Sequence, residues 1–151
     1  MKPKSLLPYH KVIIIALILA FLDVITKRII LSALKLNTPV QVFSFLDFRL
    51  VYNNGAGFSL FQGFNSVIIV LTILFILFFC YYRAEIPDNK LSIFSVSCLI
   101  GGALGNLYDR LMFGFVIDFI DFKFWPVFNF ADICLTVGFC CVLFIAVSKR
   151  G

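Results

Sequence analysis

Charged residues are scarce in this sequence. Aspartate, glutamate, lysine and arginine together make up 14% of the 151 residues, whereas soluble domains carry about 25%. Hydrophobic residues make up 62%, and the mean hydropathy is +1.04. A soluble domain of this size could not cover itself with so little polar surface, so the composition predicts an integral membrane protein in contact with membrane lipid.

Histidine is nearly absent, and its absence excludes several hydrolytic mechanisms. The single histidine, His10, precedes the first apolar run, so a His-Glu-x-x-His zinc site is impossible. No Gly-x-Ser-x-Gly motif occurs, and a serine–histidine pair would lack its histidine on the required side of the membrane. A pair of Ser59 with Lys27 is conceivable, but nothing in the spacing favours it. Aspartates are the plausible catalysts that remain.

The sequence also lacks the patterns of nucleotide, nucleic-acid and metal sites. Its glycines near residue 101 are not followed by the Gly-Lys-Ser/Thr of a phosphate-binding loop. The formal charge of +5 is not arranged as a basic stripe with interleaved aromatics. Five cysteines, an odd number, fall inside apolar runs, which indicates buried small side chains instead of disulfides or metal ligands. We expect no cofactor, no metal and no nucleic-acid partner.

Four apolar runs approach the roughly 20 residues that a spanning helix needs. They cover about 12–32, 64–82, 91–112 and 127–147. Charged residues interrupt the first run, but no small-x-small cleavage site follows its apolar core, so we interpret it as an uncleaved helix. The predicted fold class is an all-α membrane protein with four transmembrane helices, in a single domain over 1–151.

The segment between the first two runs has a different pattern. Residues 40–61 partly alternate between apolar and polar side chains, and the Asn-Asn-Gly at 53–55 marks a tight turn. We therefore predict a small extracytoplasmic β-rich segment between the first and second helices, lying at the membrane surface.

The orientation of the chain in the membrane is weakly encoded. Four spans put both termini on one side, but lysine and arginine divide almost equally between the two sides. We favour cytoplasmic termini. Helix count alone places one set of polar residues at a single membrane face, whichever orientation holds, and cytoplasmic termini make that face the extracytoplasmic one. The set is Asp23, Asn54, Asn106, Asp109, Arg110, Asp118, Asn129 and Asp132.

Asp118 and Asp132 are the candidate catalytic pair. We expect Asp132 about five residues inside the fourth span, or about 7.5 Å along it, and Asp118 at the far end of the third. Two carboxylates brought together in a partly dry site share a proton and can hold a water between a base and an acid. Each aspartate alone could instead cap a helix, but carboxylates within membrane helices usually mark function, which favours chemistry for the pair.

The other polar residues are interpreted as supports. Asp23 and Lys27 stand four apart on one helical face and can neutralise each other, so we expect them to brace the bundle. Asp109 and Arg110 are adjacent and need separate partners. Arg110 could hold a peptide carbonyl or fix a carboxylate, or it could reach lipid headgroups as an interfacial anchor.

These motifs, taken in order, resemble those of the lipoprotein signal peptidases, the type II signal peptidases of bacteria, over essentially the whole chain. Asp23 with Thr26 and Lys27 resembles the first box of the family. Four further segments resemble the later boxes of the family: "NNGAGF" (53–58), "GGALGNLYDR" (101–110), "VIDF" (116–119) and "FNFAD" (128–132). Val24 and Gly57 depart from the common residues, and the short stretch between the two aspartates suggests a differently shaped loop over the site.

The resemblance implies a function and a role for each residue. Asp118 and Asp132 would be the catalytic dyad, and the members of the supporting set would be Asn54, Gly55, Asn106, Asp109, Arg110, Asn129, Asp23 and Lys27. The substrate would be a bacterial prolipoprotein, cleaved before its diacylglyceryl-modified cysteine in the cytoplasmic membrane. The resemblance further implies inhibition by globomycin-type peptides, and we expect a monomer.

Two other classes of function remain open at this stage. A small proton- or cation-coupled carrier could use the same acids as a relay, but it needs acids reaching both faces, and the second run has none. A non-catalytic assembly or lipid-binding subunit would keep its function when the aspartates are replaced by asparagine.

Overall fold

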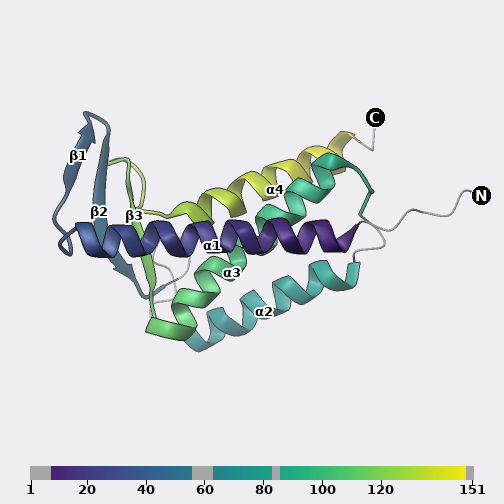
Figure 1. Ribbon diagram of the computed structural model, residues 1–151, viewed down its shortest axis with the longest axis horizontal. Coiled ribbons are helices and arrows are strands. Elements are labelled where there is room, and N and C mark those ends of the chain that lie inside the picture. The colour runs from purple at the N-terminus through teal and green to yellow at the C-terminus, as the bar shows by residue number, and fades with distance from the viewer. Residues whose placement is uncertain (1–7, 56–62, 83–85, 149–151) are drawn as a thin grey trace, which may run out of the picture.

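A computed structural model describes residues 8–55, 63–82 and 86–148 (Figure 1). The protein is mostly helical, as predicted, with one small antiparallel sheet of three strands. The helices are α1 (Tyr9–Ala33), α2 (Asn65–Tyr81), α3 (Lys90–Phe113) and α4 (Phe130–Ser148). The strands are β1 (Val40–Phe43), β2 (Leu46–Asn53) and β3 (Val116–Asp121).

The helices extend along the long axis of the molecule, and the sheet lies at one end of them, on the left of Figure 1. The start of α1 and the end of α4 lie at the opposite end. The four helices coincide with the four apolar runs, and every helix end lies within three residues of the end of its run. By length and composition, α3 and α4 are the helices that can cross a membrane in the described part of the chain, and α2 is apolar but shorter.

Helix α3 is the centre of the bundle and packs against the other three helices. Its start is capped by Asn89, whose side chain accepts a hydrogen bond from the backbone N–H of Ser92, and Gly114 ends it in the left-handed conformation. The glycines of α3 permit close approach: a Cβ on Gly102 would lie 2.5 Å from the carbonyl oxygen of Ala131 in α4. These small residues therefore allow α3 and α4 to pack closely.

The sheet extends further along the chain than we predicted. Strand β2 pairs with β1 on one side and with β3 on the other, with Val51 opposite Asp118. We expected β-structure between the first two helices, and placed residue 118 at or just past the end of the third; the structure adds the strand β3 after that helix. Gly114 stops α3, and the segment after it is extended and buried between β2 and the helices.

The start of α4 also differs from the expectation. The helix begins at Phe130, so Asp132 lies in its first turn and not five residues inside it. Asn129 Oδ1 accepts from the backbone N–H of Asp132, and Asp132 Oδ2 accepts from the backbone N–H of Asn129. This reciprocal pair is a capping box, which satisfies two N–H groups that a helix start leaves without partners.

Candidate active site

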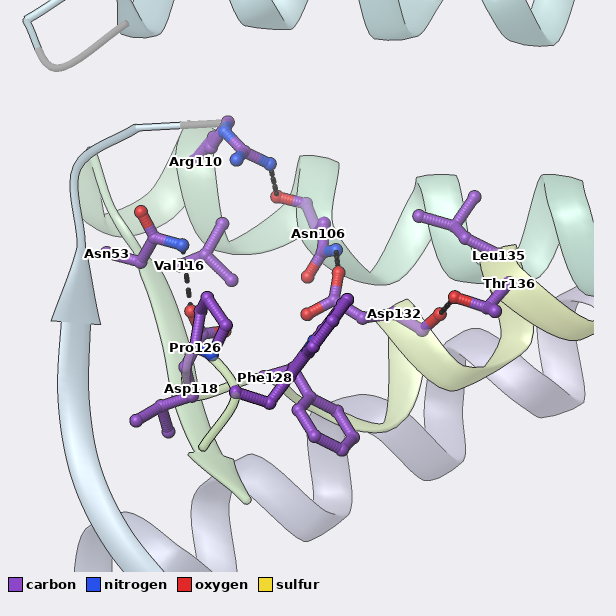
Figure 2. A pocket seen from close by; sticks show the side chains of 12 residues that line it. Asn53, Asn106, Arg110, Val116, Asp118, Pro126, Phe128, Asp132, Leu135 and Thr136 are labelled. Carbon is purple, nitrogen blue, oxygen red and sulfur yellow. Dashed lines mark hydrogen bonds between the residues drawn. The ribbon is translucent and has the colours of Figure 1, made fainter. Parts of the chain in front are cut away.

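Asp118 and Asp132 lie on the wall of one cavity of about 230 Å³ (Figure 2). It lies between the sheet, the 122–129 loop and the adjoining turns of α3 and α4. The polar residues that line it are Asn53, Asn106, Arg110, Asp118, Asp132 and Thr136. A larger, mainly apolar groove of about 810 Å³, lined by α2, α3 and α4, also reaches Asp132. The two hollows therefore meet at one carboxylate.

Strand β3 supplies Asp118, a residue that is 2% exposed. Its two oxygens accept hydrogen bonds from side-chain amides: Oδ2 from Asn53 Nδ2 at 2.8 Å, and Oδ1 from Asn129 Nδ2 at 2.7 Å. Burial, followed by the nearby negative charge of Asp132, raises the pKa of Asp118 to about 7. A carboxyl group with this pKa retains its proton over much of the range near neutral pH.

Asp132 sits at the N-terminus of α4, where the helix dipole favours a negative charge. Besides the backbone N–H of Asn129, it accepts a hydrogen bond from Asn106 Nδ2 at 2.8 Å on Oδ1. Figure 2 shows this amide pointing from α3 toward the carboxylate. Asn129 therefore donates to both carboxyl groups: its side-chain amide donates to Asp118, and its backbone N–H donates to Asp132.

A buried ion cluster lies behind this wall. Lys27 Nζ lies 2.6 Å from Asp23 Oδ2, 2.9 Å from Asp109 Oδ2 and 3.0 Å from Asn106 Oδ1. Asp23 also accepts the backbone N–H of Ala131, and Asp109 accepts that of the residue that precedes Asp118. Since its members come from α1 and α3 and bind the starts of α4 and β3, the cluster fixes the elements that carry both aspartates.

Of the remaining residues predicted for the site, Arg110 lies at the cavity and Asn54 at the surface. Arg110 is buried, and its Nη2 donates to the carbonyl oxygen of Gly55 at 2.8 Å. Asn54 is exposed, and it is Asn53 that reaches Asp118. Sequence reasoning passed over Asn53, although the alternation along β2 was a signal for it, because residues 51 and 53 point to the same face. Ser59 and the end of the "NNGAGF" motif lie outside the described residues.

Metal chemistry has no evident ligands here. In residues 8–55, 63–82 and 86–148, no group of three or more histidine, cysteine, aspartate or glutamate side chains could hold a metal ion. The two carboxyl groups at the cavity instead accept hydrogen bonds from asparagine amides.

The overall fold is shared with solved proteins. One bacterial membrane enzyme, solved by the in meso method at 2.3 Å resolution, matches with a TM-score of 0.90 and 28% identity, over 98% of this chain and 94% of that one. A second, solved at 1.9 Å resolution, matches with a TM-score of 0.83 and 30% identity, over 98% and 99% of the two chains. The fold and the site thus define an integral membrane enzyme.

The sequence comparisons identify the family. The family model described as signal peptidase (SPase) II matches residues 15–148. The lipoprotein signal peptidase of Halothermothrix orenii is 36% identical over 129 residues, 84% of this chain and 88% of that one. That of Wigglesworthia glossinidia brevipalpis is 36% identical over 151 residues, 95% and 94% of the two chains. The chain belongs to the signal peptidase II family and is a peptidase of the membrane.

Proposed function

We propose that the protein is an aspartic endopeptidase that removes signal peptides from bacterial prolipoproteins, cleaving just before the diacylglyceryl-modified cysteine. The observation that carries this proposal is the pairing of Asp118 and Asp132: one buried and one half-buried carboxyl group, from separate elements, line one small cavity and share contacts with Asn129. Relatives named lipoprotein signal peptidase support the substrate class.

The chemistry follows from one proton shared by two carboxyl groups. The ionised member removes a proton from the water between them, and the water oxygen attacks the carbonyl carbon of the scissile bond. The protonated member donates to the carbonyl oxygen as charge develops there. Collapse of the tetrahedral intermediate breaks the C–N bond, and the leaving amine takes up the proton that the base acquired. A pKa of about 7 for Asp118 is suited to this exchange near neutral pH.

The apolar groove suits a signal helix. It contains side chains of α2 such as Val67, Leu71 and Phe75, and it ends at Asn106, Arg110 and Asp132. An apolar substrate helix lying in this groove would bring its end to the carboxylate, while acyl chains next to the bond could remain in lipid.

We further propose four membrane spans, α1 to α4, with cytoplasmic termini and the cavity at the outer face of the bacterial inner membrane. The end of the molecule that carries the sheet is opposite the described ends of α1 and α4, which is the arrangement that such a topology requires. We propose a monomer whose cavity also binds globomycin-type peptides.

The test is a gel-shift assay with a diacylglyceryl-modified precursor, run with and without globomycin. Asp118→Asn and Asp132→Asn should each reduce cleavage to background while the protein still inserts in the membrane. Asp121→Asn is the matched control, because Asp121 lies on the same strand but pairs with Arg49 away from the cavity, and it should process the precursor normally. Normal turnover by either dyad variant would remove the pair from the mechanism.

A further inference from the structure

The orientation of the Asn106 side chain is imposed by Lys27. An ammonium group has only donors, so the atom of Asn106 that faces Lys27 Nζ at 3.0 Å must be the amide oxygen. Asn129 Nδ2 donates to the same oxygen at 3.0 Å. The amide nitrogen of Asn106 is therefore left to face Asp132 Oδ1, and the Asp132 oxygen there must accept.

The two amides that face Asp118 are oriented differently, by the backbone. Asn53 Oδ1 accepts from the backbone N–H of Gly55 at 2.9 Å, and Asn129 Oδ1 accepts from the backbone N–H of Asp132 at 2.9 Å. The nitrogens of both amides must then face Asp118. Of the three asparagines around the pair, only Asn106 depends on a charged side chain for its orientation.

The two carboxyl groups consequently have unequal surroundings. Asp132 has a helix N-terminus, a backbone N–H donor and the amide held by Lys27. Asp118 lies on a strand, where no helix dipole acts, and its donors among the described residues are two neutral amides. The negative charge of the pair is thus better stabilised on Asp132.

The charges that surround the pair come from two helices. Helix α1 contributes Lys27 and Asp23, and α3 contributes Asp109 and Arg110. Helix α2 has no ionisable acid or base near the site, since its sequence contains none but cysteine and tyrosine. The other charged side chains of the sheet form ion pairs away from the dyad: Arg49 with Asp121, and Asp47 with Lys123 in the turn after β3.

We propose that Lys27 is a positioning residue for the dyad: through Asn106 it holds Asp132 as the ionised base, so that the shared proton stays on Asp118. The inference rests on the proposed function, because it assigns the roles within that dyad. It gives the buried lysine a task beyond neutralising Asp23 and Asp109.

The first test compares two variants that disturb the same ion cluster. Lys27→Met removes the donor to Asn106 and a positive charge, so kcat should fall about 10²-fold, with KM within about threefold, and the alkaline limb of the pH–rate profile should move up by about one pH unit. Asp23→Asn keeps the Lys27–Asn106 contact and removes a negative charge, so its alkaline limb should move to lower pH.

The opposite shifts of the alkaline limb in the two variants distinguish a positioning role of Lys27 from a purely structural role. A brace would lower the folded fraction in both variants, measured by size-exclusion chromatography, and leave the pH profile of the folded enzyme unchanged. An unchanged kcat and limb in folded Lys27→Met, or limbs that move the same way in both variants, would overturn the proposal.

A double variant covers the case in which Lys27→Met does not fold. Lys27→Met with Asp23→Asn removes the ion pair as a unit, so the formal charge of the cluster, one lysine against two aspartates, stays at minus one. Its alkaline limb should lie near that of the unmodified enzyme, while kcat stays low because Asn106 has lost its donor. Full kcat in this variant would contradict the proposal.

An infrared measurement is independent of proteolysis. The carbonyl stretch of a protonated carboxyl group is followed across about pH 4 to 9. It should be absent in Asp118→Asn. In Asp132→Asn it should persist at the low-pH end of that range. Loss of the band in Asp132→Asn alone would place the proton on the other residue and refute this inference. If instead the band behaves as expected but no precursor is cleaved, the proposed function fails and the assignment of the proton stands.

Discussion

The asparagines shape the site as much as the aspartates do. Asn53, Asn106 and Asn129 each use the amide oxygen on a fixed donor and the amide nitrogen on a carboxylate. Neutral donors of this kind hold a carboxyl group in place without forcing it to ionise, which an arginine or lysine in direct contact would do. The proton of the pair can therefore remain in the site.

Asn53 and Asn54 make a matched pair for testing this. Asn53→Ala removes a donor at 2.8 Å from Asp118, so kcat should fall by about tenfold, roughly the loss expected when a buried carboxyl group loses one hydrogen bond. Asn54→Ala alters an exposed side chain and should have a clearly smaller effect. Steady-state cleavage of a lipidated precursor measures both, and a larger loss in Asn54→Ala would contradict the geometry.

The raised pKa of Asp118 predicts a pH dependence with a definite sign. Its value is about 7 in the folded protein against 3.8 for an ordinary aspartate, so between these values the folded state binds a proton that the unfolded state lacks. Stability should therefore fall as pH rises through this window, and activity should fall as pH passes about 7. Melting temperature and rate against pH measure both, and Asp118→Asn should abolish this part of the stability change.

Much of the site could be predicted at this scale, because polar residues inside apolar runs are conspicuous. Asn106, Arg110, Asp118 and Asp132 do line one cavity. The choice between Asn53 and Asn54 could not be made with the same ease, because both are asparagines next to a turn. The pairing of β2 with β3, which places Asn53 opposite Val116, makes the distinction.

Among the elements, α3 is the one whose surface decides how the others approach. Its small residues let α4 lie close enough for Asn106 to reach the first turn of α4, and let α1 insert its ion pair beside Gly105. The strand β3 was missed because Val-Ile-Asp-Phe is apolar and follows a helix, so its pattern does not distinguish a strand from a continued helix. Its partner, β2, lies more than sixty positions earlier in the chain.

Gly102→Ala tests the close contact of α3 with α4. Helix propensity alone would stabilise the variant by up to about 1 kcal/mol, but the new Cβ would meet the Ala131 carbonyl oxygen at 2.5 Å. Overpacking of this kind destabilises by about 1–3 kcal/mol, so we expect a lower melting temperature and lower activity. Ala146→Leu, on an exposed position of α4, adds more volume and should change neither. A stabilised Gly102→Ala would show that the helices can separate freely.

At the scale of the whole molecule, the property to test is the orientation of the protein in the membrane. The sequence left it weakly determined because lysine and arginine are nearly balanced, and the fold adds that the sheet and the cavity share one end. Orientation is set during insertion by the lysine and arginine bias of the segments that flank the helices, and in this sequence that bias is small.

Reporter fusions measure this orientation. A fluorescent protein joined to the C-terminus should fluoresce, because it folds in the cytoplasm, and alkaline phosphatase at that place should be inactive. Alkaline phosphatase joined after Thr38, between α1 and β1, should be active, since that segment is proposed to lie outside. The reverse pattern at both positions would invert the proposed topology.

The interlocked amides have a consequence for ligands. None of the three asparagine amides can flip without placing two donors or two acceptors face to face, because both the oxygen and the nitrogen of each amide have fixed partners. The dipoles around the two carboxyl groups are therefore aligned before anything binds, and the proposed mechanism needs no rearrangement of them as charge develops in the transition state. A compound that imitates the tetrahedral intermediate should meet a rigid template, so its affinity should follow the fit of its own shape and not the adaptability of the enzyme.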